Sequence, residues 1–412
     1  MICLGKTSVL MMKTGIKPVG ILYLSYDGML EPLGQSQVLS YLVRLASYRR
    51  IHLISFEKSA DWENVVDRQR IAKEISTAGI DWHPLRYHKS PSALATAWDI
   101  FCGISLGLWL VVRYRISVVH ARSYVASLMA LAIKRIAGVK FIFDMRGFWA
   151  DERVDGKLWS KTGKLYWIAK FFEQHFFLAA DHVVVLTKAT VQELKRFPYL
   201  KDCFPELTVI PTCADLKTFK RDTDRSVDSK FVLGYVGSAG TWYLFDEVAK
   251  CFSLLLKIHP EAKLLVVNRN DHSYINQRLI LAGIPNDSVD LVASNHADVP
   301  KLMARMSAGI FFYQASYSRI ACAPTKLAEF LGCGIPCLSN VGVGDMADLL
   351  ETEQVGVAIK SFDDESKMQA INQLIKLVNE PKISTRCVAA AQRHFSLDEG
   401  VRLYDEIYKS LC

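Results

Sequence analysis

The stretch Ala323-Pro324-Thr325-Lys326-Leu327-Ala328-Glu329-Phe330-Leu331-Gly332-Cys333-Gly334-Ile335-Pro336 predicts a short helix that turns into a strand. Proline near its start and glycine beyond its last turn are the signals that begin and end helices. At 3.6 residues per turn, Leu327, Phe330 and Leu331 share one apolar face, and Glu329 projects about 140° away from it. We therefore expect that face to be buried and Glu329 to be exposed and available to a ligand.

The start of this helix lacks a side-chain acceptor. The expected N-cap residue, Ala323, has no side-chain oxygen, so the first backbone N–H groups need another acceptor. An anion such as a diphosphate can accept those hydrogen bonds. In the alternative interpretation, Lys326 and Glu329 only form a surface ion pair, which contributes about 0.2–0.5 kcal/mol.

The rest of the chain predicts an α/β fold with two domains. Its 412 residues exceed the size at which a single core keeps growing. Apolar runs of strand length alternate with helix-period segments, which is typical of doubly wound parallel sheets. In the first half these runs are 21–26, 51–56, 80–85, 116–120, 140–145 and 182–186. In the second half they are 231–236, 263–268, 289–292, 309–313, 335–339 and 355–359.

A charged segment between 214 and 229 interrupts the apolar rhythm and has the composition of a linker. It divides the chain into a first domain, residues 1–214, and a second domain, residues 215–390. Residues 391–412 follow as an amphipathic C-terminal helix.

Composition narrows the class of partner. The net charge of +8 favours an acidic or polyanionic partner. Nucleic acid is not expected, because the chain has no long basic stripe with interleaved aromatic residues. The ten cysteines include no Cys-x-x-Cys pair, which indicates a reduced, cytoplasmic protein without a structural zinc site.

Residues 100–112 form an uncharged apolar run that Arg113 and Arg115 follow. Thirteen residues fall short of the roughly 20 that cross a bilayer. We interpret the run first as a buried helix and second as a helix that lies in a membrane interface.

Two further segments, both in the first half of the chain, carry motifs that have to be considered together with the helix of 323–336. Residues 27–37, Asp-Gly-Met-Leu-Glu-Pro-Leu-Gly-Gln-Ser-Gln, form a glycine-bearing loop, and residues 143–152 read Phe-Asp-Met-Arg-Gly-Phe-Trp-Ala-Asp-Glu. In this order the three segments resemble glycosyltransferase family 4. The resemblance implies the GT-B fold, in which two Rossmann-like domains face a central cleft. The N-terminal domain would bind the acceptor, the C-terminal domain the sugar nucleotide, and the last helix would cross back onto the first domain.

The same resemblance implies an activity. We expect retaining transfer of a sugar from a nucleoside-diphosphate sugar to an acceptor hydroxyl, in polysaccharide or lipid-linked glycan assembly. No cofactor or metal is expected. The enzyme would be cytoplasmic, with peripheral contact to the inner face of the cell membrane. The alternatives are a sugar-nucleotide epimerase or hydrolase of the same fold, and a non-catalytic partner in glycan assembly.

The donor site is expected where the strand of 231–236 ends. In open α/β sheets, ligands bind beyond the carboxyl ends of the strands. Gly237-Ser238-Ala239-Gly240-Thr241 is a glycine loop that opens a helix, and such loops bind phosphate when they are more than ordinary turns. The loop matches neither the dinucleotide fingerprint nor the Walker loop, which disfavours a dehydrogenase or a P-loop NTPase.

By resemblance, Glu329 would contact the ribose of the donor. The chain departs from the family at two places. No basic residue follows Gly237 closely, and position 321 is alanine where the family has the first of two glutamates eight positions apart, of which Glu329 matches the second. Arg319 and Lys326 are the candidates for phosphate charge. The predicted donor-binding residues are Gly34, Gly237, Ser238, Gly240, Thr241, Arg319, Thr325, Lys326 and Glu329.

The predicted catalytic residues are His120, Asp144 and Arg146. His120 ends a strand, and its titration near neutral pH suits proton transfer, although a structural histidine is the alternative. Asp144 and Arg146 follow the next strand within the family-like segment and could bind acceptor hydroxyls.

Overall fold

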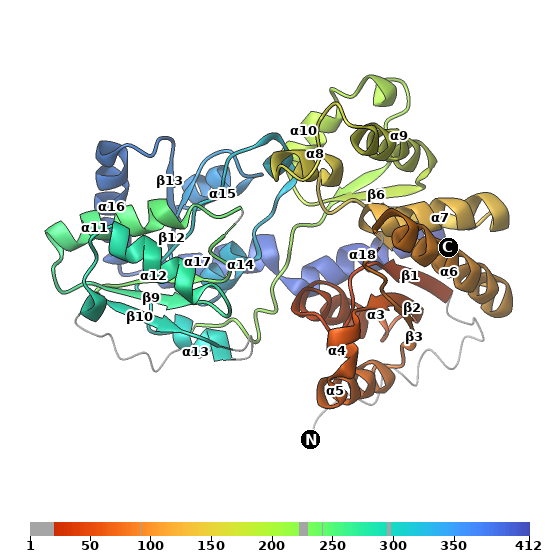
Figure 1. Cartoon of the computed structure of the whole chain (residues 1–412), viewed down its shortest axis with the longest axis horizontal. Helices are drawn as coiled ribbons and strands as arrows, with labels where there is room; N and C mark the ends of the chain where they lie inside the picture. The colour runs from red at the N-terminus through yellow and green to blue at the C-terminus, as the bar shows by residue number, and fades with distance from the viewer. Residues whose placement is uncertain (1–19, 91, 222–229, 241, 295–297) are drawn as a thin grey trace.

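The computed structural model describes residues 20–90, 92–221, 230–240, 242–294 and 298–412. They fold into two lobes, each a parallel sheet covered by helices (Figure 1). The α/β class and the two Rossmann-like domains of a GT-B fold are thereby confirmed.

The first domain holds a seven-stranded sheet in the order β3-β2-β1-β4-β5-β6-β7. Its strands are β1 Gly20–Ser25, β2 Arg50–Glu57, β3 Asp81–Arg86, β4 Val118–Arg122, β5 Lys140–Asp144, β6 His182–Val185 and β7 Leu207–Val209. All neighbouring pairs are parallel. Apolar runs predicted the first six strands, whereas β7 is an edge strand of three half-buried residues that leaves little signal.

Helices cover both faces of this sheet. One face packs against α3 Ser40–Leu45 and α5 Val65–Thr77, and the other against α6 Ser92–Tyr114, α7 Ser123–Ala137 and α9 Lys164–Ala179. Shorter elements complete the domain: α2 Pro32–Gly34, η1 Gln35–Leu39, α4 Ser59–Glu63, α8 Trp149–Asp155, α10 Lys188–Leu194 and η2 Pro198–Leu200.

The second domain holds a six-stranded parallel sheet in the order β10-β9-β8-β11-β12-β13. Its strands are β8 Val232–Val236, β9 Lys263–Val267, β10 Val289–Val292, β11 Ala308–Ile310, β12 Cys337–Asn340 and β13 Gly356–Ile359. Its helices are α11 Phe245–Ile258, α12 His272–Leu281, η3 Asn286–Ser288, α13 Val299–Met303, η5 Tyr317–Ala321, α14 Thr325–Gly332, α15 Met346–Thr352, α16 Asp364–Val378 and α17 Ile383–Phe395.

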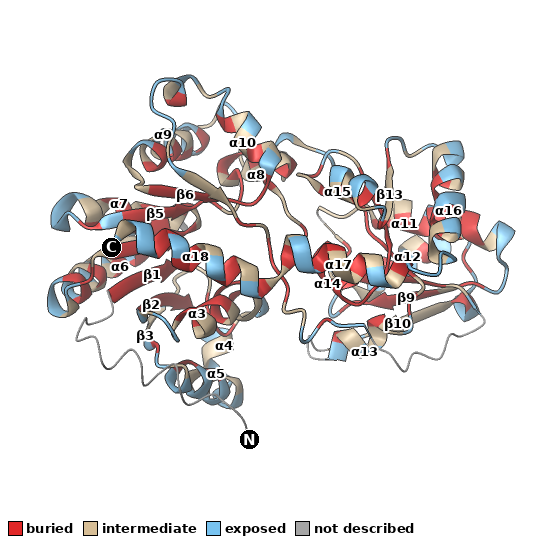
Figure 2. Cartoon of the chain, turned by 180° about the vertical axis from the view of Figure 1, so that it is seen from behind, coloured by how far each residue is buried: buried red, intermediate tan, exposed pale blue. Residues whose placement is uncertain are grey.

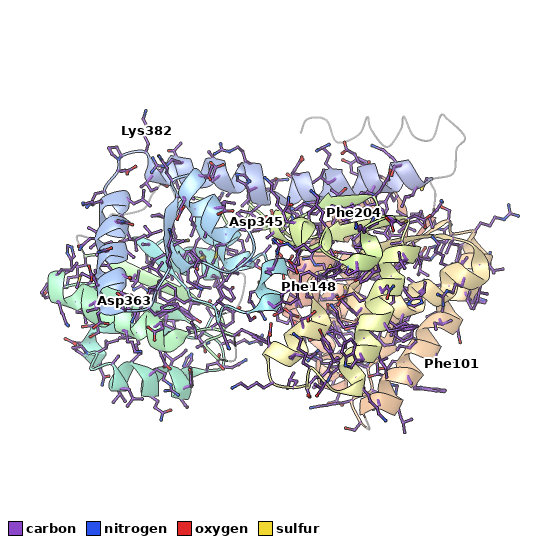
Figure 3. The ribbon with its side chains drawn as sticks, turned by 90° about the horizontal axis from the view of Figure 1, so that it is seen from above. Phe101, Phe148, Phe204, Asp345, Asp363 and Lys382 are labelled. Atoms are coloured by element: carbon purple, nitrogen blue, oxygen red, sulfur yellow. The ribbon has the colours of Figure 1, made fainter. Side chains whose placement is uncertain are left out.

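The chain crosses between the domains at two adjacent points. Ala214 and Ser396 form a parallel bridge, in which the Ala214 N–H donates to the Phe395 carbonyl at 3.0 Å and the Leu397 N–H donates to the Ala214 carbonyl at 3.2 Å. The last helix, α18 Leu397–Leu411, then packs on the first domain (Figure 3). The second crossing therefore lies at Ser396 and not at residue 390, because α17 buries its apolar face in the second domain up to Phe395.

Helix α6 contains the apolar run of 100–112 and is longer than that run. It is 23 residues long, and by length and composition alone it could cross a membrane. Its inner face is buried: a Cβ at Gly103 would lie 2.5 Å from Met129 Sδ, so glycine lets α6 approach α7 closely. Its outer face is exposed, which corrects the expectation of a fully buried helix (Figure 2).

Candidate active site

Strand order identifies the crevices in which ligands bind. In the first sheet the order reverses between β1 and β4, and in the second between β8 and β11. The carboxyl ends of the two sheets face each other, since the backbone N–H groups of Lys188 and Ala189, after β6, donate to Asp345, after β12, at 2.6 and 2.8 Å. Asp345, labelled in Figure 3, lies where the domains meet.

A cavity of about 550 Å³ lies between the domains. Its lining includes Leu186 and Pro211 from the first domain, and Ala323, Pro324 and Met346 from the second. The N-terminus of α14 therefore opens on this cavity, and a ligand there can reach the first backbone N–H groups of the helix.

The glycine loop after β8 is fixed by the second domain itself. The Gly237 N–H donates to the Val267 carbonyl at 2.8 Å, and Asn268 Nδ2 donates to the Gly237 carbonyl at 2.9 Å. The Ala239 N–H donates to Asp271 Oδ2 at 3.1 Å. Gly237 has a φ of 98°, a backbone conformation that favours glycine.

Three further residues of this loop were predicted to bind the donor: Ser238, Gly240 and Thr241. Ser238 is exposed, and a Cβ added at Gly240 would meet open space. Thr241 lies outside the described residues. Because Asn268 and Asp271 already hold the loop, a bound anion would not have to order it.

Helix α14 begins at Thr325, and its N-cap is Pro324 and not Ala323. Pro324 has extended backbone angles, φ −69° and ψ 123°, so the helix starts one residue later than predicted. The cap makes no side-chain hydrogen bond, which confirms that the helix start lacks a side-chain acceptor. Leu327, Phe330 and Leu331 are buried as predicted.

Lys326 is a buried cation against the glycine loop. A Cβ at Gly237 would lie 2.9 Å from Lys326 Cε. The Nζ atom lies 3.6 Å from the ring centroid of Tyr243 and 4.7 Å from that of Tyr235. Among the described residues it has neither a hydrogen-bond partner nor an ion-pair partner. Burial lowers the pKa of Lys326 to about 7, so an anion beside Nζ would favour the charged form.

Glu329 is buried, and the expectation of an exposed carboxylate was wrong. Its exposed fraction is 9%, because α14 packs against the sheet on one side and against α17 on the other. Burial raises the pKa of Glu329 to about 7, although the charge of Lys326 acts in the opposite direction. The two side chains form no ion pair within 4 Å, and neither is at the surface, so the alternative of a surface pair is also wrong.

Arg319 lies on η5 at the interface between the domains. Its guanidinium carbon is 4.3 Å from the ring centroid of Trp242, and Nη2 is 3.5 Å from Glu152 Oε1 on α8. The carboxylate of Glu152 already compensates the charge of Arg319. Of the two candidates for phosphate charge, Lys326 is therefore the one that lacks an ion-pair partner within the described part of the chain.

Position 321 supplies no carboxylate to the cleft. Ala321 is buried, and its carbonyl oxygen lies 3.9 Å from the position of a Cβ at Gly147. Next to it, the Ser318 N–H donates to Asp155 Oδ2 at 3.0 Å, and Tyr317 stacks on Phe148 at 5.3 Å. These contacts join η5 to α8 and close one side of the interdomain space.

The three predicted catalytic residues lie together, with His120 and Arg146 both close to the carboxylate of Asp144. His120 Nε2 lies 3.5 Å from Oδ2, and Arg146 Nη1 lies 3.8 Å from Oδ1. Two tyrosines of α18 cover them: the Tyr404 hydroxyl donates to Asp144 at 3.0 Å, and the Tyr408 hydroxyl lies 2.7 Å from His120 Nδ1.

This cluster is sealed from solvent, since His120 and Asp144 are each 1% exposed. Burial lowers the pKa of His120, and the charge of Asp144 only partly opposes that shift. His120 and Asp144 therefore fasten α18 to the first domain in this conformation, and Arg146 is the member that retains some exposure. Their catalytic role stays a prediction.

Gly34 has a packing role. A Cβ there would lie 1.9 Å from the Gly28 carbonyl oxygen, so only glycine lets the loop after β1 fold on itself. Glu57 fixes the loop by accepting the Met29 N–H at 2.8 Å and the Leu30 N–H at 3.2 Å.

Arg122 is a site residue that was not among the predicted ones. It ends β4 at the switch point, and its Nε lies 3.3 Å from Asp27 Oδ2 in the loop after β1. Arg122 is buried, and its Nη1 has no hydrogen-bond partner among the described residues. Its place directly after an apolar run was the sequence signal that could have identified it.

Two family models match the chain. The model described as "Glycosyl transferase 4-like domain" matches residues 48–205, and the one described as "Glycosyl transferases group 1" matches residues 217–394. No curated protein sequence matches the chain.

Several solved structures share the fold at low sequence identity. A glycosyltransferase from Rickettsia africae has 14% identity and a TM-score of 0.71, with 96% of this chain and 99% of that chain covered. Sucrose-phosphate synthase from Thermosynechococcus elongatus has 12% identity and a TM-score of 0.68, with 95% and 99% covered. Anabaena Alr3699/HepE in complex with UDP and glucose has 14% identity and a TM-score of 0.67, with 95% and 100% covered.

Two facing Rossmann-like domains, each with a parallel sheet between layers of helices, are the GT-B architecture. The two family matches cover one domain each. Each domain is thus of a glycosyltransferase type, glycosyl transferase 4-like in the first and group 1 in the second, and the protein is a glycosyltransferase.

Proposed function

We propose that this enzyme transfers a sugar from a uridine-diphosphate sugar to an acceptor hydroxyl with retention of anomeric configuration. The observation that carries the donor class is Lys326, a buried amine against the Gly237 loop that forms no hydrogen bond or ion pair with any residue that the structure describes. A diphosphate at this point would supply the missing negative charge.

The leaving group is the nucleoside diphosphate, and its developing charge would be stabilised by fixed groups. These groups are the N-terminus of α14, the Lys326 ammonium and the backbone N–H groups of the loop after β8 other than those of Gly237 and Ala239, which donate within the domain. All three belong to the second domain and are held before the donor binds, which is electrostatic preorganisation. This work needs no divalent cation, so we propose turnover without metal.

The uridine base is proposed from the solved structures. Alr3699/HepE, with the same fold, has been crystallised with UDP and with UDP-glucose. Glu329, one turn beyond Lys326 on α14, is the proposed acceptor of hydrogen bonds from the ribose.

The acceptor is proposed to bind on the first domain. Arg122 and Asp27 lie at the carboxyl ends of β4 and β1, at the switch point of that sheet. They are the polar groups at that crevice that could orient a hydroxyl. We propose a glycan or lipid-linked acceptor at the cytoplasmic face of the membrane, and thus a role in polysaccharide or lipid-linked glycan assembly.

Calorimetric titration tests the donor class. UDP should bind the wild-type enzyme, and Lys326→Met should weaken binding about ten- to a hundredfold, the effect of losing a charged hydrogen bond. If the enzyme binds ADP or GDP but does not bind UDP, the proposed uridine base is wrong.

Product analysis tests the reaction. Incubation with UDP-sugars and a candidate acceptor should give a new glycoside with the anomeric configuration of the donor, read by NMR. Release of free sugar or an isomerised nucleotide without any acceptor would show a hydrolase or an epimerase instead.

A further inference from the structure

One layer of helices on the first domain has an unusual outer surface. Helices α6, α7 and α9 cover the same face of the sheet and share one buried core with its strands. They lie side by side in the order α6-α7-α9, on the outer side of the first domain (Figure 1).

Helix α6 presents large apolar side chains to solvent along its whole length. Five of them are 54–77% exposed: Leu94, Trp98, Phe101, Trp109 and Val112. Their successive spacings of four, three, eight and three residues keep them near one side of the helix, opposite the buried Leu110 and Val111. Phe101, labelled in Figure 3, lies at the outer edge of the molecule.

Helix α9 adds a second set of exposed apolar side chains. Its exposed apolar residues are Leu165, Trp167, Ile168, Phe171 and Leu178, each 46–63% exposed. Together the ten residues on α6 and α9 form what we call the aromatic face. Single exposed apolar residues are ordinary, but a set of this size with five aromatic rings marks an interaction surface.

The charges on the three helices are of one sign. Their only carboxylates are Asp99 and Glu173, both buried, and both accept a hydrogen bond from a tyrosine hydroxyl. Every other charged side chain of these helices is basic: Arg113, Lys134, Arg135, Lys164 and Lys170. Lys134 pairs with Asp181, and Lys170 pairs with Asp151 and Glu173, so the positive charge that these helices offer to a partner is that of Arg113, Arg135 and Lys164. The helices themselves therefore expose apolar and aromatic side chains together with basic ones.

We propose that the aromatic face binds the surface of an anionic lipid bilayer. Trp side chains prefer the boundary between headgroups and acyl chains, and nearby Lys and Arg are attracted to anionic lipids. A protein partner would more commonly meet a mixture of charges in the rim of its interface. This inference does not depend on the nucleotide site, so it can be tested independently of the proposed function.

Helix α6 lies on the membrane and does not cross it. Its inner face contributes Leu110 and Val111 to the core beneath the sheet, and Gly107 sits against Ile133 of α7. Crossing the bilayer would require α6 to leave that core. Binding along one exposed side requires no rearrangement of the domain.

Vesicle sedimentation tests the proposal with the full-length protein. The wild type should bind vesicles of phosphatidylcholine with phosphatidylglycerol more tightly than vesicles of phosphatidylcholine alone. The double variants Trp98→Ser/Phe101→Ser and Trp167→Ser/Phe171→Ser should each lower binding about tenfold or more, because each removes two side chains that would be buried in lipid.

The matched control is Ile280→Ser/Leu281→Ser on α12 of the second domain. These residues are 68% and 70% exposed, so the control removes a similar exposed apolar area elsewhere. It should leave vesicle binding unchanged. All three variants should keep wild-type UDP binding, which shows that they are folded and separates this test from that of the donor site.

A charge variant tests the electrostatic part. Arg135→Glu/Lys164→Glu should weaken binding to the anionic vesicles and reduce its dependence on salt. The proposal is overturned if the wild type does not bind anionic vesicles or if the aromatic variants bind as well as the control. It is equally overturned if light scattering shows a dimer that the aromatic variants dissociate, since a second copy would then occupy this face.

Discussion

The Tyr404 hydroxyl donates a hydrogen bond to Asp144 Oδ2 at 3.0 Å and joins two residues that are 260 positions apart in the chain. Both side chains are buried, so the bond lies in a medium of low dielectric constant, where it is strong and where its loss is costly. Because Asp144 also meets His120 and Arg146, this one bond connects the C-terminal helix to the ends of two central strands.

Tyr404→Phe should lower the free energy of unfolding by about 1–3 kcal/mol, because it leaves a buried carboxylate without one of its donors. Urea unfolding measures the change. Tyr48→Phe is the matched control, since Tyr48 is 50% exposed, and it should have almost no effect. Equal stability of Tyr404→Phe and wild type would show that this bond does not hold α18.

Lys326→Met should remove a pH dependence from UDP binding. The pKa of Lys326 in the free protein is about 7, so above that pH the amine is neutral and must take up a proton when the diphosphate binds. Wild-type affinity should fall by up to about tenfold per pH unit above pH 7. Calorimetry should show a flat profile for the methionine variant between about pH 7 and 9. A flat wild-type profile would contradict the assignment of Lys326 to the phosphates.

Glu329→Gln should change how stability depends on pH. The folded-state pKa of about 7 is above the ordinary value of 4.5, so the contribution of this group is fully present below about pH 4.5 and is lost as the pH rises through 7. The glutamine variant should therefore gain stability relative to wild type between about pH 5 and pH 8, measured by thermal unfolding. Its affinity for UDP should fall about tenfold or more if Glu329 accepts hydrogen bonds from the ribose. A variant with unchanged affinity would remove Glu329 from the donor site.

Gly237→Ala and Gly240→Ala should behave differently although they lie in one loop. At Gly237 the φ of 98° disfavours alanine, and the added Cβ would lie 2.9 Å from Lys326 Cε. We expect a loss of stability of about 1–3 kcal/mol and weaker UDP binding. Gly240 is not among the glycines with a left-handed φ, and an added Cβ would meet open space, so its alanine variant should fold normally. Similar effects at both positions would contradict the role given to the Gly237 backbone.

Turnover should survive chelation. The positive charge for the leaving diphosphate is assigned to Lys326 and to the N-terminus of α14. Initial rates with EDTA should equal those without it, and added magnesium or manganese should not raise them. Activity that EDTA abolishes and a divalent cation restores would show that these groups are not sufficient.

Periodicity predicted the central strands well because they are buried on both faces and leave a continuous apolar run. The run of 263–268, for example, corresponds to β9 Lys263–Val267. The half-buried edge strands β3, β10 and β13 were also predicted, so partial burial alone does not hide a strand. β7 was missed because it has only three residues, Leu207–Val209, between Pro205 and Pro211.

The environment of Glu329 could not be predicted from its own helix. A helical wheel separates a buried face from the others on the assumption that only one face has a neighbour. Helix α14 has two, the sheet and α17, and α17 lies more than fifty residues further along the chain. The ion pair between Arg319 and Glu152 could not be predicted for the same reason, because the two residues lie in different domains.

The bridge between Ala214 and Ser396 makes the second domain an insertion within the first. A ribosome releases the first domain's strands early, but Tyr404 and Tyr408, which cover His120 and Asp144, emerge after the whole second domain. The second domain is complete before them and can fold while the first still has an open core. Domains usually mature in the order of synthesis. In this enzyme the later domain should reach its native state first, and the first domain should become protease-resistant only after α18 has emerged from the ribosome.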